Sequence, residues 1–188
     1  SHKKIKHYCQ TQGIEYLSTA FDSDSLQFLV NDIKLERLKI PSGELTNTPF
    51  VLAHALTGCE LIVSTGMATN EEIKQALSAI AYGLLQPSEP PSEAEFARAY
   101  ASEQGQTLLK RRVSLLHCTT EYPAPIDDVN LNAMQSMEKE FGLPIGYSDH
   151  TEGILIPVAA VAQGARVIEK HFTLDKTMEG PDHKASLE

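Results

Sequence analysis

The sequence predicts an α/β protein of the (β/α)8-barrel type, in which parallel strands alternate with helices. Short apolar runs alternate with amphipathic segments along most of the chain, a pattern typical of a parallel sheet covered by helices. Polar side chains follow nearly every run at its C-terminal end, whereas a doubly wound sheet gathers them at one switch point. No glycine-rich dinucleotide fingerprint follows a run, which also favours the barrel.

The apolar runs give the strands in chain order. The predicted strands are Ile14–Ala20, Leu38–Ile40, Leu61–Ser64, Val113–Cys118, Ile145–Tyr147 and Val167–Ile168. A complete barrel has eight strand–helix units. We therefore expect an incomplete barrel of about six units. The first two strands are expected to be missing, because the chain opens on a helix that no strand precedes.

Capping signals place the helices between these strands. Gly13 ends the first helix, Asp22 caps the second, and Pro49 lies in the first turn of the third. Thr69 and Glu72 have the spacing of a capping box and begin the fourth. The expected helices cover residues 2–12, 22–33, 47–58, a segment that begins at 69, and then 131–141 and 154–163.

Residues 86–107 interrupt this alternation. Pro87, Pro90 and Pro91 precede a small acidic helix near residues 92–103. We interpret the stretch as a surface insertion within one partial barrel domain that covers residues 1–188.

Composition narrows the class of protein. A net charge of -9 disfavours nonspecific binding to nucleic acid or to acidic membranes. No apolar run has the length of a membrane-spanning helix, and the basic N-terminal segment lacks the apolar core of a signal peptide, so we expect a cytoplasmic protein. The cysteines Cys9, Cys59 and Cys118 are odd in number and widely separated, which predicts reduced thiols.

Two of the predicted strands end in histidine. His150 follows the fifth strand and His171 follows the sixth, and acidic residues lie close to both in the sequence. Neutral imidazoles on neighbouring barrel strands can hold a catalytic divalent metal. A structural or surface role for both histidines remains the alternative.

Other polar residues follow the strands. Lys39 ends a strand and precedes Ser42 and Gly43, so an ammonium, a hydroxyl and backbone amides could receive a phosphate or carboxylate. The alternative is a solvated lysine. Thr120 and Tyr122 could present hydroxyls to the same ligand, whereas His117 and Cys118 within the strand are interpreted as packed groups. Asp182, on the last loop, either binds sugar hydroxyls or is a solvated turn residue.

Five motifs together resemble the sialic acid synthase (N-acetylneuraminate synthase) family, which includes the bacterial legionaminic and pseudaminic acid synthases. In order they are Lys39 to Glu44, His117 to Pro125, Gly146 to Thr151, Glu169 to Phe172 and Gly180 to Leu187. The resemblance implies a (β/α)8 barrel that condenses phosphoenolpyruvate with an N-acetylated mannose-type sugar. The expected products are a nine-carbon 2-keto acid, sialic or legionaminic acid, and inorganic phosphate.

The resemblance also implies roles for residues of this chain. His150 and His171 would hold a divalent metal, Mn2+ first with Mg2+ or Co2+ as alternatives, and with Glu169 they would form the catalytic group. Where some members have Asn on the phosphoenolpyruvate side, this chain has Thr120. The expected ligands of phosphoenolpyruvate are Lys39, Ser42, Tyr122 and Ser148, and the residues expected near the sugar are Glu44, Glu169 and Asp182.

The resemblance leaves two alternatives open. The family's first two strands and its C-terminal antifreeze-like domain, whose Arg reaches the site of the partner subunit, are not found in these residues. Because that Arg reaches the partner's site, the parent enzyme is expected to be a homodimer. Because the other segments are not found, the 188 residues alone are expected to be inactive or to act as a metal- and phosphate-binding module. The second alternative is another metal-dependent barrel aldolase or 2-keto acid synthase.

Overall fold

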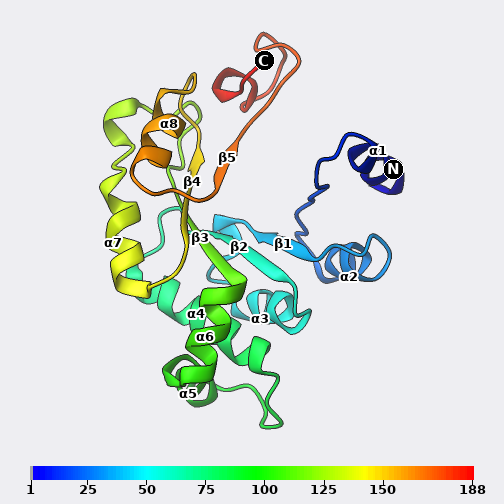
Figure 1. Cartoon of the computed structure of the whole chain (residues 1–188), viewed down its shortest axis with the longest axis vertical. Coiled ribbons are helices and arrows are strands. Elements are labelled where there is room, and N and C mark those ends of the chain that lie inside the picture. Colours follow the sequence, from blue (N-terminus) through cyan, green and yellow to red (C-terminus); the bar gives the residue numbers. More distant parts are fainter. Residues whose placement is uncertain (1) are drawn as a thin grey trace.

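The computed structural model describes residues 2–188 and contains one parallel sheet (Figure 1). Within these residues the sheet has five strands in the order β1-β2-β3-β4-β5, the same as their order in the chain. Strand order that follows the chain without reversal is typical of a barrel and not of a doubly wound sheet. The strands are Arg37–Ile40 (β1), Glu60–Ser64 (β2), Val113–Cys118 (β3), Ile145–Asp149 (β4) and Ile168–Lys170 (β5).

The sheet curves strongly across its width. In a flat sheet neighbouring strands lie about 4.8 Å apart, so the edge strands β1 and β5 would be separated by about 19 Å. Instead, Nζ of Lys39 on β1 lies 2.8 Å from Oε2 of Glu169 on β5. Side chains of this length meet only when the sheet curls. The predicted incomplete barrel is therefore confirmed.

Helices α3 to α8 connect consecutive strands, α1 and α2 precede β1, and capped helices begin where their signals predicted. Asp22 accepts a hydrogen bond from the Ser25 backbone amide, and Thr69 with Glu72 forms the capping box. Helices α3, α6, α7 and α8 contact the strands directly. The helices are His2–Thr11 (α1), Ser23–Asn31 (α2), Thr48–Leu56 (α3), Asn70–Leu85 (α4), Glu93–Ala101 (α5), Glu103–Arg112 (α6), Asn132–Phe141 (α7) and Leu155–Ala162 (α8). Three single turns of 3-10 helix are Ser42–Glu44 (η1), Ile126–Asp128 (η2) and His183–Ala185 (η3).

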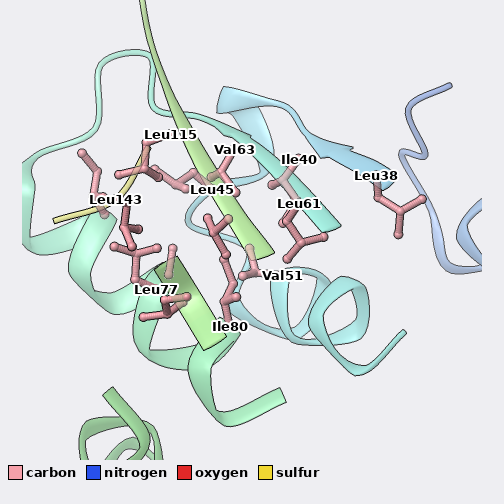
Figure 2. Packing of buried hydrophobic residues seen from close by; sticks show 14 of the residues in the cluster. Leu38, Ile40, Leu45, Val51, Leu61, Val63, Leu77, Ile80, Leu115 and Leu143 are labelled. Carbon is pink, nitrogen blue, oxygen red and sulfur yellow. The ribbon is translucent and has the colours of Figure 1, made fainter. Parts of the chain in front are cut away.

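The hydrophobic core lies between the sheet and the helices that cover it. Figure 2 shows alternate residues of the strands, such as Leu61 and Val63 of β2, packed with side chains from α3 and α4. The same buried core includes Leu38 and Ile40 of β1. Because successive residues of a strand point to opposite faces, Lys39 is directed away from this core. One face of the curled sheet is therefore apolar and the other is free to carry polar groups. The labelled members of the core also include Leu45, Val51, Leu77, Ile80, Leu115 and Leu143.

The strand predicted over Ile14–Ala20 does not form, so that prediction is wrong. The segment is extended, but within residues 2–188 it joins no ladder with β1. Its contact with β1 is instead the ion pair of Glu15 and Arg37, with 2.5 Å between Oε2 and Nη1. Ile14 and Leu17 remain 59% and 38% exposed. Strands are stabilised by neighbours on the same face, and this segment's apolar side chains find few.

Residues 86–112 form two helices where one was expected. Ser102 ends α5 and begins α6, because its Oγ accepts a hydrogen bond from the Gly105 backbone amide at 2.9 Å. Both helices pack on α4, and the rings of Phe96 and Tyr82 meet edge to face with centroids 5.1 Å apart. Leu109 of α6 is buried in the same core as the sheet. None of the helices in residues 2–188 is long and apolar enough to span a membrane.

Candidate active site

A cavity of about 360 Å3 lies at the C-terminal ends of the strands and contains most of the predicted site residues. Its walls come from strands β1 to β5, from the segments that follow β1, β3, β4 and β5, and from the segment before α2. The C-terminal ends of the strands are the face on which barrel proteins place their sites. The predicted residues that line the cavity are Lys39, Ser42, Tyr122, Ser148, His150, Glu169 and His171.

Strand register explains why three polar side chains form one row. Cys118 of β3 is the register partner of Ser148 on β4, and Ser148 is the partner of Glu169 on β5. Register partners in a parallel sheet point to the same face, and here that face is the inner one. The curl of the sheet then brings Lys39 from the opposite edge to complete the row.

Glu169 is held by two of its neighbours in this row. Its Oε1 accepts hydrogen bonds from Ser148 Oγ at 2.6 Å and from Lys39 Nζ at 2.9 Å. Burial acts to raise the pKa of Glu169, but the charge and hydrogen bond of Lys39 and the hydrogen bond of Ser148 outweigh it. The pKa of Glu169 is therefore lowered, and the side chain is a carboxylate at neutral pH. A carboxylate is thus bonded to an ammonium and to a hydroxyl within the cavity.

The two predicted histidines line the same cavity. The ring centroids of His150 and His171 are 5.4 Å apart. Nδ1 of His150 lies 2.7 Å from the Thr119 carbonyl oxygen, which can only accept, so Nδ1 carries the proton and Nε2 keeps its lone pair. Burial lowers the pKa of His150, an effect that the carbonyl of Thr119 opposes and the neighbouring His171 reinforces. The neutral form that a metal requires is therefore favoured.

The donor set fits a divalent metal with two protein ligands from this chain. A carbonyl that fixes the tautomer of a ligating histidine is a usual second partner in metal sites. No group of three or more His, Cys, Asp or Glu side chains in residues 2–188 is arranged to hold a metal ion. These residues would therefore supply two imidazole ligands to the metal, and the other coordination positions would be open to water or substrate.

Tyr122, in the loop after β3, packs against both histidines, and its ring is tilted toward that of His150 and edge to face with that of His171. Its ring centroid lies 4.0 Å from that of His150 and 5.6 Å from that of His171. The loop is tied to the strand end by the Ala124 amide, which donates to the His150 carbonyl at 2.8 Å. Burial raises the pKa of Tyr122, and nearby negative groups add to the effect. The phenol therefore stays protonated at neutral pH and can donate a hydrogen bond to a ligand.

Three predicted site residues do not line the cavity. Glu44 is half-buried on η1, where its carboxylate accepts a hydrogen bond from the Asn47 side chain at 2.8 Å. Thr120 is exposed in the loop after β3. Asp182 is also exposed, although its charge contributes to the raised pKa of Tyr122. The roles expected for these three side chains stay predictions.

The cavity also has walls that the sequence did not predict. Thr19 and Phe21 come from the segment before α2, and Ser64 ends β2. Lys170 of β5 completes this group. The rule that functional residues follow strand ends would have identified Ser64. It would also have identified Phe21, which directly follows the segment expected to be a strand.

The turn after β2 leaves room for Ser42. Gly66 has a φ of +53°, and a Cβ built on it would lie 2.6 Å from Cβ of Ser42. Its amide donates to Sγ of Cys118 at 3.1 Å. Burial raises the pKa of Cys118, so this residue is a thiol and not a nucleophilic thiolate. His117, whose Nε2 lies 2.8 Å from the Val129 carbonyl, is likewise a packed group.

The fold and cavity define a class of protein. It is a barrel protein whose site, at the C-terminal ends of parallel strands, combines an ammonium, a carboxylate, hydroxyls and a pair of imidazoles. Such a site is suited to an anionic ligand beside a divalent cation.

Comparison with known proteins identifies the family. The chain belongs to the NeuB family, whose family model matches residues 1–188. The N,N'-diacetyllegionaminic acid synthase of Campylobacter jejuni subsp. jejuni serotype O:2 is 47% identical over 188 residues, which are 100% of this chain and 49% of that protein. The N,N'-diacetyllegionaminic acid synthase of Legionella pneumophila is 43% identical over 187 residues, which cover 100% of this chain and 46% of that protein.

A solved structure agrees with this assignment. The N-acetylneuraminic acid (sialic acid) synthetase of Leptospira borgpetersenii matches with a TM-score of 0.78 and 34% identity. The match covers 100% of this chain and 57% of that one. The present chain therefore spans about half the length of the curated relatives that it matches.

Proposed function

We propose that the protein containing this chain condenses phosphoenolpyruvate with an N-acetylated mannose-type sugar to give a nine-carbon 2-keto acid and inorganic phosphate. The observation that carries the proposal is the cavity itself, where the Lys39–Glu169–Ser148 cluster lies beside the pair of His150 and His171. Membership of the NeuB family supports it, since relatives with 47% and 43% identity are named as synthases of a sugar acid of this kind.

The chemistry has two substrates with different needs. Phosphoenolpyruvate brings a phosphate and a carboxylate, and Lys39 with the hydroxyls of Ser42, Ser148 and Tyr122 would receive them. The sugar brings an aldehyde in its open-chain form. A divalent cation, Mn2+ first with Mg2+ or Co2+ as alternatives, would be held by His150 and His171 and would polarise that aldehyde as a Lewis acid.

The bonds that form and break follow from these positions. C3 of the enol attacks the aldehyde carbon of the sugar and forms the new C–C bond. Water adds to the C2 cation that this leaves, and the proton that it releases converts the former aldehyde oxygen to a hydroxyl. The resulting hemiketal phosphate loses inorganic phosphate by cleavage of its C2–O bond while its hydroxyl proton passes to the phosphate, which yields the 2-keto acid. Glu169 is bonded to Lys39 and Ser148 in the same cavity as the imidazoles, where a carboxylate can orient the water or the sugar hydroxyls.

A Schiff-base aldolase is less well supported. Its lysine is activated by an apolar pocket or by a neighbouring cation. Lys39 instead faces the carboxylate of Glu169 at 2.8 Å, and Lys170 faces that of Asp149 at 2.5 Å. Borohydride trapping with pyruvate would label an aldolase lysine, and we expect no labelling here.

The decisive experiment measures phosphate release from phosphoenolpyruvate in the presence of Mn2+ by the natural full-length polypeptide that contains these residues. N-acetylmannosamine and 2,4-diacetamido-2,4,6-trideoxymannose serve as alternative acceptors. We expect release that requires an acceptor, and the diacetamido sugar is the first choice because relatives at 47% and 43% identity are diacetyllegionaminic acid synthases. Release that is independent of both acceptors would refute the proposal.

A further inference from the structure

An ion pair links the two strands just before their histidines. Asp149 ends β4 and immediately precedes His150, and Lys170 ends β5 and immediately precedes His171. Asp149 and Lys170 are also register partners across the two strands. The pair therefore joins the strands at the last position before each imidazole leaves the sheet.

This pair is buried and extensively bonded. Nζ of Lys170 lies 2.5 Å from Oδ2 of Asp149, and the two side chains are 9% and 0% exposed. Lys170 also donates to the carbonyl of Thr151. Oδ1 of Asp149 accepts from the Thr151 hydroxyl at 2.9 Å and from the Thr151 amide at 3.1 Å. The backbone on both sides of His150 is thus fastened to the strand that carries His171.

Stability alone does not account for such a cluster. The free-energy cost of removing two charges from water is about as large as the free-energy gain from their attraction. An apolar pair of similar volume often stabilises a protein as much or more. The ion pair instead fixes the local geometry, because its charge-assisted hydrogen bonds hold the backbones of β4 and β5 at one separation and in one register. Groups outside the coordination sphere orient metal-ligating histidines and tune the affinity for the metal.

We propose that Asp149, Lys170 and Thr151 form a positioning cluster that sets the separation between the imidazoles of His150 and His171. Neither Asp149 nor Thr151 lines the cavity, and the cluster uses the ammonium of Lys170 to bond these two residues. It acts through the backbone, and it keeps two ligands from different strands at the spacing that one cation needs. The inference rests on the metal site of the proposed function, and its test is arranged so that the two can fail separately.

The test compares three variants with the wild-type chain. Asp149→Asn combined with Lys170→Met removes the ion pair but keeps an acceptor for Thr151. Lys170→Arg keeps the charge and is the conservative control. Thr151→Val has nearly the same volume and deletes only the hydroxyl bonds to Asp149. Thermal melting establishes which variants fold.

The first measurement is Co2+ affinity, followed by the visible absorption of the bound ion. Removing an outer partner of a metal ligand typically costs about 10–100-fold in affinity. We expect a loss of that size in the double variant, a smaller loss in T151V and near wild-type binding in K170R. Wild-type affinity in a folded double variant would overturn the proposal. An unfolded double variant together with unchanged affinity in T151V would also overturn it, because the cluster would then serve stability alone.

The second measurement needs no metal. In the metal-free wild-type chain the rings of His150 and His171 are close enough for a nuclear Overhauser effect between their ring protons. We expect this effect to persist in K170R and to weaken or vanish in the double variant and in T151V. If the wild type bound no Co2+, the proposed metal site would be wrong, and the Overhauser effect would still decide on positioning. An effect that is unchanged in the folded variants would contradict the inference.

Discussion

Lys39→Met removes the cation from the centre of the candidate site, and its consequences can be worked out from the structure. The side chain of Lys39 is 10% exposed and that of Glu169 is 40% exposed. Breaking a fully buried pair costs about 3–5 kcal/mol, but the exposure of Glu169 reduces this through solvent screening to about 1–2 kcal/mol. At about 2–4 °C for each kcal/mol in a chain of this size, the melting temperature should fall by about 2–8 °C.

The pH dependence of this loss has a definite sign. The folded pKa of Glu169 is lowered from 4.5, since Lys39 and Ser148 outweigh the effect of burial. A carboxylate with a lowered pKa contributes stability that is present above the unfolded value and is lost as the pH falls through the folded value. The difference between wild type and K39M should therefore be full at pH 7 and should shrink in acid. Denaturant unfolding at several pH values measures it.

The same variant should also lose anion binding. A hydrogen bond from a charged donor is worth about 1.5–3 kcal/mol, so inorganic phosphate should bind about 10–100-fold more weakly, as measured by calorimetry. Lys139→Met is the matched control, because Lys139 is exposed on α7 outside the cavity. It should change neither property. A K39M protein with wild-type phosphate affinity would refute the assignment of Lys39 as the anion-binding cation.

Three further predictions concern other parts of the chain. Gly146→Ala should lower the free energy of unfolding by about 1–3 kcal/mol, as measured by thermal melting, because a Cβ there would lie 2.4 Å from the Val167 carbonyl oxygen. Gly43→Ala is the control and should have little effect, because a Cβ on Gly43 would have no atom within 4 Å. Glu169→Gln should bind inorganic phosphate more tightly than wild type while losing turnover, since the competing carboxylate charge is gone; weaker phosphate binding would contradict this. Burial lowers the pKa of His54 from 6.5, despite its bond to the Phe50 carbonyl, so stability should fall as the pH drops below 6.5 and fall less in His54→Gln. An equal slope in that variant would show that His54 is not the cause.

Local signals in the sequence predicted most of the fold. The capping box at Thr69 and the cap at Asp22 depend on contacts three residues apart, which the sequence shows directly. The segment 14–20 was wrongly predicted as a strand because its apolar residues have the composition of a strand, whereas a strand also needs a partner ladder. The helix α6 was missed because the cap that begins it, Ser102, lies within the stretch expected to be a single helix.

The candidate site was predicted less completely, for a similar reason. Positions at strand ends indicated Lys39, His150 and His171 correctly as neighbours, since parallel strands bring their C-terminal ends together. The contact between Lys39 and Glu169 depends on how tightly the sheet curls, and no local pattern encodes that curvature. Phe21 directly follows the segment 14–20, so the same rule would have identified it, although that segment is extended and is not a strand.

The central claim is that one cavity holds a divalent cation on two histidines and an anion on Lys39 at the same time. Its most direct test is the Mn2+-induced relaxation of the phosphorus nucleus of phosphoenolpyruvate, measured with and without the protein. We predict a protein-dependent enhancement that is lost in the H150A/H171A double variant and also in K39M. An enhancement that survives in H150A/H171A would show that the cation binds elsewhere and would contradict the account.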